Sequence, residues 1–372
     1  MLILEYLTRM KENILKVATV FSGIGSPEFA LRRANIPHEI VFACDNGDID
    51  FCTSEEVMTA EMEKLTVAEK KQYITSKLPK KTNFVKKSFM ANYEISEEHF
   101  HHNVRFLDGT EYKGKVDLFI GGSPCQSFTL LGHQKGLEEA RGTLFYDFAR
   151  LIQEIEPKAF IYENVQGLVK HDSGRTWEIV QRVFDSLGYK VHSKVLDAAN
   201  YGIPQRRRRI FVVGFREGGE LFKFPAEKTL TFTMQDFLLE NTPFGCFESK
   251  DGEICITHKK GEIDEKYFLS EKILPGILSA GTGGFSMKPE IDLKIARPLM
   301  RTMHKMHRAG EDNYVTTNGR VRKLVPRECL RLMGFTDDFK QVVSDTQMYQ
   351  QAGNSMVVDV MKLLIEETIK HI

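Results

Sequence analysis

The chain has 372 residues, of which 42% are hydrophobic, and its 51 basic and 51 acidic side chains give a formal net charge of zero. This balance argues against a protein that coats nucleic acid or membranes non-specifically, although it is compatible with a local basic cleft. No stretch approaches the roughly 20 apolar residues that a membrane-spanning helix needs. The length predicts one large core and a smaller second domain.

The first 16 residues, MLILEYLTRMKENILK, mix charges with apolar residues and lack a small-residue cleavage site. They predict an amphipathic helix and not a signal peptide. The chain also contains six scattered cysteines: Cys44, Cys52, Cys125, Cys246, Cys255 and Cys329. Because they form no C-x-x-C pair, and no histidine pair has metal-ligand spacing, we expect a reduced, cytoplasmic setting and no metal site.

Short β-rich runs alternate with helical segments over residues 1–216. VATVF (17–21) breaks at a glycine turn and continues as a helix, and TLFYDFARLIQEIEP (143–157) has helical spacing between two strands. The other predicted strands are EIVFACD, VDLFIGG, AFIYENV, KVHSKVL and RIFVVGF. This alternation predicts an α/β fold with a doubly wound, mostly parallel sheet. Ligands of such sheets bind at the carboxyl ends of the strands.

Two segments depart from this alternation. Residues 51–85 contain two capping-box patterns, beginning at Thr53 and Thr66, followed by Lys/Glu-rich sequence. We interpret them as a helical insertion with a solvated surface and assign it no chemistry. From 217 to 296 the strands become short and Gly, Thr, Lys and Phe frequent, which predicts a smaller β-rich domain. Residues 297–372 end in an amphipathic helix and are expected to rejoin the first domain.

Glycines and acids follow the first strands. The turn Phe21-Ser-Gly23-Ile24-Gly25 lets a ligand approach the backbone, but such a turn alone also serves tight packing. Asp45 ends the next strand, where an acid can hold two ribose hydroxyls, and Asp48 is an alternative. Asp108 could reach an adenine amino group. Taken singly, each acid is as readily a surface carboxylate, but together they predict an adenosine pocket without the G-x-G-x-x-G pattern of pyrophosphate sites.

The next strand ends carry nucleophilic and charged side chains. A free cysteine is most often a small buried hydrophobe, yet GGSPCQSFT (121–129) places Cys125 among glycines and proline that build an exposed loop. Glu163 at the end of AFIY is costly without a partner or a task. Four consecutive arginines usually face solvent or phosphates, but strand alternation would point Arg207 and Arg209 towards one face.

In family order over nearly the whole chain, a series of motifs resembles the DNA (cytosine-5)-methyltransferases: FSGIGS, GGSPCQSF, RGTLFYDFARL, ENV, QRRRRIF, RKLVPRECLRLMGF and QAGNSMVV. The resemblance implies a methyltransferase fold that uses S-adenosylmethionine, with residues 217–296 recognising the target. It implies a monomer that methylates C5 of a flipped-out cytosine in double-stranded DNA. The enzyme would be half of a restriction-modification system, with a separate endonuclease, or an orphan or phage methylase.

The resemblance also implies roles for four catalytic residues. Cys125 would attack C6 as a thiolate. Glu163 would hydrogen-bond N3 and the exocyclic amine, and Arg209 would bind O2, where negative charge develops. Arg207 would support Glu163 and the cysteine.

Two further sets of residues follow from the resemblance. Those expected to bind the cofactor are Phe21, Gly23, Ile24, Gly25, Asp45, Asp108, Pro124, Leu144, Asn354 and Met356. Those expected to contact DNA are Gln126, Ser127, Thr282, Gly284 and Thr302, with loop 279–288 and segment 301–313 around the last three. The chain departs from the family pattern at four positions beside these residues: Ser22, Ser26, Asn46 and Gly109.

Three alternatives remain open on the sequence. A nicotinamide-dependent oxidoreductase would explain FSGIGS and Asp45 but leaves Cys125, Glu163 and the arginines without a role. A transfer RNA cytosine-5 methyltransferase of the same fold would share the catalytic residues and differ in the recognition domain. An inactive DNA-binding relative would have lost catalytic residues, whereas this chain keeps them.

Overall fold

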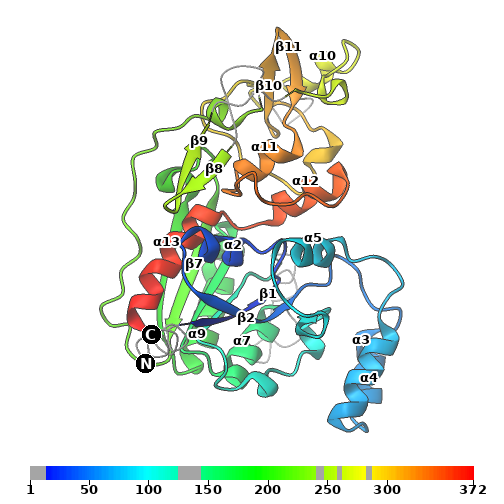
Figure 1. The fold of residues 1–372 in the computed structure, drawn as a ribbon, viewed down its shortest axis with the longest axis vertical. Helices are drawn as coiled ribbons and strands as arrows, with labels where there is room; N and C mark the ends of the chain where they lie inside the picture. The colour runs from blue at the N-terminus through cyan, green and yellow to red at the C-terminus, as the bar shows by residue number, and fades with distance from the viewer. Residues whose placement is uncertain (1–13, 125–143, 240–246, 258–261, 282–286) are drawn as a thin grey trace, which may run out of the picture.

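The computed structural model describes residues 14–124, 144–239, 247–257, 262–281 and 287–372 (Figure 1). Its centre is a seven-stranded sheet in the order β3-β2-β1-β4-β5-β7-β6. The strands are β1 (Leu15–Val20), β2 (His38–Cys44), β3 (Phe100–His101), β4 (Leu118–Gly121), β5 (Ala159–Val165), β6 (Lys190–Asp197) and β7 (Arg208–Phe215). Strands β1 to β5 pair in parallel, and β7 is antiparallel to both of its neighbours. The prediction of a mostly parallel sheet is confirmed.

Helices cover both faces of the sheet. Successive strand residues point to opposite faces, so Leu118 and Ile120 share a core with helices α2 (Ser26–Arg33) and α13 (Val358–Thr368). Phe119, between them, packs instead with α7 (Leu144–Ile155) and α9 (Arg175–Ser186). The strand order reverses between β1 and β4, so the carboxyl ends of these strands form the switch point at which such folds bind ligands.

Three helices stand between β2 and β3: α3 (Glu55–Met62), α4 (Val67–Lys77) and α5 (Phe84–Asn92). Helices α3 and α4 form a hairpin that projects from the body, whereas α5 lies against it (Figure 1). Thr66 forms the expected capping box with Glu69, but the first helix is capped by Ser54, one residue after the expected Thr53.

The remaining elements include two hairpins, β8 (Phe247–Lys250) with β9 (Glu253–Ile256) and β10 (Tyr314–Thr317) with β11 (Arg320–Lys323). The other helices are α8 (Gly167–Lys170), α10 (Leu274–Ile277), α11 (Pro326–Arg331) and α12 (Asp345–Asn354). Short 3₁₀ turns span Glu97–His99, Val104–Phe106, Gly109–Tyr112, His171–Gly174, Ala198–Tyr201, Met234–Phe237, Glu265–Tyr267, Met303–Lys305 and Ile369–His371.

Helix α10 and the β10–β11 hairpin lie together at one end of the molecule, above α11 and α12 (Figure 1). Leu269 and Ile277 share a small hydrophobic cluster there with Ala309 and Tyr314. The cluster draws residues from both sides of position 296, and the domain boundaries at 216 and 296 stay predictions. None of the helices in the described part of the chain is long and apolar enough to span a membrane.

Candidate functional site

The turn after β1 and the acid after β2 are joined at the carboxyl edge of the sheet. Phe21, Gly23 and Gly25 all have positive φ, at 53°, 54° and 78°. The Gly23 N–H donates to Asp45 Oδ2 at 2.9 Å, and the Gly47 N–H donates to Asp45 Oδ1 at 2.8 Å. A Cβ built on Gly23 would meet no atom within 4 Å, so the turn borders open space.

Asp45 and Asp48 have different partners. Burial raises the pKa of the Asp45 carboxyl, and the two backbone hydrogen bonds oppose that rise. Asp48 instead forms an exposed ion pair with Arg301, at 2.6 Å. Of the two acids, Asp45 is therefore the one that the structure places on the glycine turn.

Besides Phe21, four further predicted cofactor residues lie on the segments around the switch point: Ile24, Leu144, Asn354 and Pro124. Phe21 packs on the hydrophobic cluster between the sheet and helices α7 and α9, and so does Leu144, the first residue of α7. Ile24 is buried in the core on the other face of the sheet. Asn354 ends α12 exposed, and no described residue hydrogen-bonds its side chain. Pro124 is exposed beside these residues on the chain that leaves β4.

The structure does not bring Asp108 to this group. Its carboxylate accepts the Thr110 N–H at 3.0 Å and caps a 3₁₀ turn. The next residue, Gly109, donates its N–H to Glu154 Oε2 at 2.9 Å. Glu154 lies ten residues along α7 from Leu144, which is about 15 Å at the helical rise of 1.5 Å per residue.

Glu163 and Arg209 form a largely but not fully buried ion pair at the carboxyl end of β5. Arg209 lies opposite Val165 in the β5–β7 register, so its side chain emerges on the same face as Glu163, two residues away. Arg209 Nε is 3.0 Å from Glu163 Oε1, and their side chains are 19% and 13% exposed. Burial raises the pKa of Glu163, whereas the charges of Arg209 and Arg207 lower it. A buried carboxyl that can hold a proton therefore lies beside a fixed positive charge.

The four consecutive arginines divide as strand alternation predicts. Arg207 is buried and donates to the carbonyl oxygens of Leu299, Gly353 and Ser355 at 2.8–3.0 Å. Burial lowers its pKa to about 9. The hydrogen bonds of Arg207 therefore fasten the chain around Asn354 to β7, and only its charge reaches Glu163.

The comparisons with known proteins agree with this geometry. Residues 60–370 match the family model described as C-5 cytosine-specific DNA methylase. The chain is 36% identical over 250 residues to the type II methyltransferase M.HhaI of Haemophilus parahaemolyticus, which covers 67% of this chain and 74% of that protein. The chain belongs to the C-5 cytosine-specific DNA methylases. This membership supports the methyltransferase prediction over the oxidoreductase alternative.

Other relatives align with a larger share of this chain. The orphan methyltransferase M.SPRI of Bacillus phage SPR is 26% identical over 466 aligned positions, covering 95% of this chain and 97% of that protein. The crystal structure of the Dnmt2 methyltransferase of S. pombe matches with a TM-score of 0.64 at 19% identity, over 96% of this chain and 98% of that one. A putative DNA modification methyltransferase of an E. coli prophage matches at 0.57 and 18%, over 96% and 99%. Both structural matches support the fold alone.

The methylase site contains residues that sequence reasoning did not single out. Asn164 donates from Nδ2 to Ser123 O at 2.9 Å, and Ser123 Oγ lies 2.7 Å from the Tyr162 hydroxyl. Gly122 is equally constrained, since an added Cβ would lie 2.8 Å from Glu163 O and 3.0 Å from Met356 Cε. The contact also places the predicted cofactor residue Met356 beside Glu163. The ENV motif could have indicated this contact from the sequence. Its asparagine, Asn164, holds Ser123, which is two residues before Cys125.

Five predicted residues lie outside the described part of the chain: Cys125, Gln126, Ser127, Thr282 and Gly284. Thr302 is described, half-buried, with its Oγ1 3.1 Å from His307 Nε2. Among the described residues, no group of three or more His, Cys, Asp or Glu side chains could hold a metal ion. The expected lack of a metal remains a prediction.

Proposed function

We propose that this methylase acts on cytosine in double-stranded DNA through a covalent bond between Cys125 and C6 of the base, with S-adenosylmethionine as methyl donor. The observation that carries the proposal is the largely buried Glu163–Arg209 pair. It lies at the sheet edge where Asn164 holds Ser123, two residues before Cys125. The carboxyl, the guanidinium and Ser123, the described residue two positions before Cys125, are therefore held by neighbouring strands.

The residues around the switch point fit the donor. Asp45 would accept the ribose hydroxyls, because each of its oxygens has a lone pair beyond the one used by Gly23 or Gly47. The open space beside Gly23 suits close approach of a ligand to the backbone. Phe21, Leu144 and Asn354 would line the remaining sides. When bound, S-adenosylmethionine supplies an electrophilic methyl group.

The protein side chains then control charge on the cytosine ring. The Cys125 thiolate adds to C6, and the electron pair displaced through the ring is stabilised when the Glu163 carboxyl donates its proton towards N3. Arg209 stabilises the charge at O2. After methylation, C5 loses its proton to water, and the electron pair of that C–H bond forms the C5–C6 double bond. The C6–S pair leaves with sulfur as the Cys125 thiolate, and N3 returns its proton to Glu163. The raised pKa of Glu163 suits it to hold the proton that N3 needs.

The proposal extends to the role of the enzyme. Type II and phage orphan methyltransferases are both among the relatives, so the chain would modify one short site in cytoplasmic DNA, with or without a separate endonuclease. Residues 217–296, together with Gln126, Ser127 and Thr302, would contact the duplex. A monomer is sufficient, because all the proposed catalytic residues come from one chain.

Incubation with labelled S-adenosylmethionine and genomic DNA tests the reaction, and bisulfite sequencing of the product identifies the target. Transfer RNA supplied in a parallel assay tests the alternative substrate. Label in DNA at one recurring cytosine supports the proposal. Label only in transfer RNA, or in neither nucleic acid, contradicts it.

The covalent step gives the sharpest prediction. Wild-type protein should be trapped irreversibly on a duplex that carries 5-fluorocytosine at the target when the methyl donor is present, because fluorine cannot leave C5 as a proton does. Cys125→Ser should form no trapped complex and lose activity by at least about 10³-fold, since a serine hydroxyl is far less ionised than a thiol. A denaturing gel resolves the complex. Normal methylation by Cys125→Ser would disprove covalent catalysis by this residue.

A further inference from the structure

The α3–α4 hairpin, to which sequence analysis assigns no chemistry, is fastened at both ends to the loops around the proposed cofactor site. We propose that Asn83 and Glu55, at the two roots of this hairpin, are positioning residues for the adenosine half of the methyl donor. The inference rests on the proposed function. The hairpin, interpreted from the sequence as an insertion with only a solvated surface, would then support cofactor binding.

The first root is Asn83, which precedes α5. Its Oδ1 accepts the Lys86 N–H at 2.9 Å and caps the helix, while its Nδ2 donates to Asp45 O at 2.8 Å. Gly47 packs against the same amide, because an added Cβ would lie 2.2 Å from Asn83 Oδ1. Gly47 in turn donates to the Asp45 carboxylate. One side chain at the point where the chain leaves the hairpin for α5 therefore holds both the backbone of the ribose acid and the glycine that orients it.

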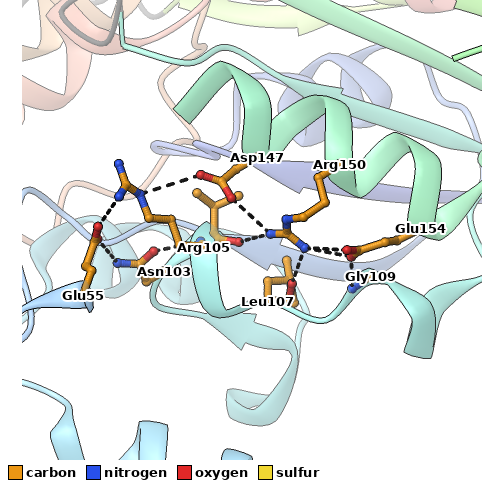
Figure 2. A network of polar contacts seen from close by, with 9 residues as sticks. Glu55, Asn103, Arg105, Leu107, Gly109, Asp147, Arg150 and Glu154 are labelled. Carbon is orange, nitrogen blue, oxygen red and sulfur yellow. Dashed lines mark hydrogen bonds and ion pairs between the residues drawn. The ribbon is translucent and has the colours of Figure 1, made fainter. Parts of the chain in front are cut away.

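The second root is Glu55, in the first turn of α3 (Figure 2). Its carboxylate pairs with Arg105 and accepts a hydrogen bond from Asn103 Nδ2 at 3.4 Å. Arg105 also lies 3.7 Å, Nε to Oδ2, from Asp147 in the first turn of α7. The root of the hairpin is thus connected to the helix that begins with Leu144, a predicted cofactor contact.

Asn103 and Arg105 belong to the loop that follows β3, and α7 clamps the rest of this loop (Figure 2). The Arg150 guanidinium donates to Val104 O at 2.8 Å and to Leu107 O at 3.0 Å. In a parallel sheet the residues directly after β3 lie at the same edge as Asp45, and Asp45 N indeed donates to His101 O at 3.1 Å. The hairpin, through Glu55, and α7, through Arg150, hold this loop beside the ribose acid.

These contacts act through other residues and not on the cofactor directly. If Asp45 and the loop after β3 shift, the ribose and adenine lose complementary partners, whereas Glu163, Arg209 and Ser123 on the other side of β1 keep theirs. Loss of a root should therefore weaken donor binding without slowing the chemical step. This division between KM and kcat separates positioning from a general structural role.

Asn83→Asp isolates the first root. Aspartate still caps α5, but its carboxylate cannot donate to Asp45 O. We expect a melting temperature close to that of the wild type, about a 3- to 10-fold rise in Kd for S-adenosylhomocysteine and in KM for the donor, and unchanged kcat. Asn83→Ala removes cap and donor together, so it should show the same rise in Kd with a lower melting temperature.

Glu55→Gln isolates the second root, with Glu63→Gln as the matched control. Both acids lie on the hairpin, but Glu63 is exposed and forms no ion pair with any residue that the structure describes. Because glutamine keeps the size of Glu55 and removes its charge, we expect a rise of about 2- to 5-fold in Kd. The control should bind as the wild type does, and the double variant Asn83→Asp/Glu55→Gln should bind more weakly than either single one.

Isothermal titration with S-adenosylhomocysteine and steady-state kinetics on DNA give all of these values. Unchanged donor affinity in the double variant would overturn the inference, as would a loss of kcat with unchanged KM. Failure of the proposed function looks different: the wild type itself would bind no S-adenosylhomocysteine or form no 5-methylcytosine.

Discussion

Glu28, in the first turn of α2, is a fully buried acid next to the glycine turn that follows β1. Its Oε1 accepts a hydrogen bond from Thr19 Oγ1 at 2.7 Å, and its Oε2 has no hydrogen-bond partner among the described residues. Burial raises the pKa of Glu28 from 4.5 to about 7. The folded protein therefore holds this proton more tightly than the unfolded chain does.

The raised pKa makes stability depend on pH. The stabilising contribution of the proton is complete below about pH 4.5 and is lost as the pH rises through about 7. Glu28→Gln keeps the acceptor for Thr19 and removes the charge, so at pH 8 it should be more stable than the wild type by up to about 3 kcal/mol. Near pH 5 the difference should shrink. Urea unfolding at both values measures it, and parallel pH curves for the two proteins would contradict the account.

At the scale of elements, Arg207 joins β7 to two distant segments through three backbone carbonyls. Arg207→Lys keeps a charge but replaces the planar guanidinium, which can reach three acceptors in fixed directions. We expect the free energy of unfolding to fall by about 3 kcal/mol, and KM for the donor to rise because the chain around Asn354 loses its anchor. Arg208→Lys, on the exposed side of the same strand, provides the control for stability. Equal stability of the two variants would contradict this role.

The sequence predicted the elements whose signals are local. Five-residue apolar runs and glycine turns located the strands, and alternation along the arginines placed Arg207 and Arg209 on the side of Glu163. Contacts between distant segments were not predictable in this way. Asn83 bonds to Asp45 across 38 residues, and Gly109 bonds to Glu154 across 45.

The same limit applies to the position of Asp108. The sequence predicted it beside the adenine, whereas its carboxylate caps a 3₁₀ turn. The segment after β3 consists of short 3₁₀ turns without hydrophobic periodicity, so its path is set by its tertiary contacts with Arg150 and Glu154. Asn103, two residues after β3, is instead hydrogen-bonded to Glu55, and its neighbour Val104 is held by Arg150. To contact the adenine, an amide such as that of Asn103, close to the end of β3, is thus a better candidate than the carboxylate of Asp108, seven residues after the strand.

The whole molecule is electrically neutral, so attraction to DNA has to come from local charge. Arg206 and Arg208 provide such charge beside the site. Their side chains are 56% and 58% exposed, and both lie near Asp197, which neutralises part of their charge. Because β7 is antiparallel to β5, these arginines lie at the edge where Glu163 lies, while Arg216 lies at the opposite edge.

We therefore expect Arg206 and Arg208 to contact phosphates that flank the target base. In the double variant Arg206→Gln/Arg208→Gln, the slope of log K against log salt should become shallower by about 1 to 2, because each lost phosphate contact removes about 0.9. Arg216→Gln removes one positive charge just beyond the far end of the strand and should leave the slope unchanged. Fluorescence anisotropy of a labelled duplex, titrated at several salt concentrations, measures the slopes. If the slope of the double variant stays at the wild-type value, as the slope of the Arg216 control should, DNA does not reach this edge of the sheet.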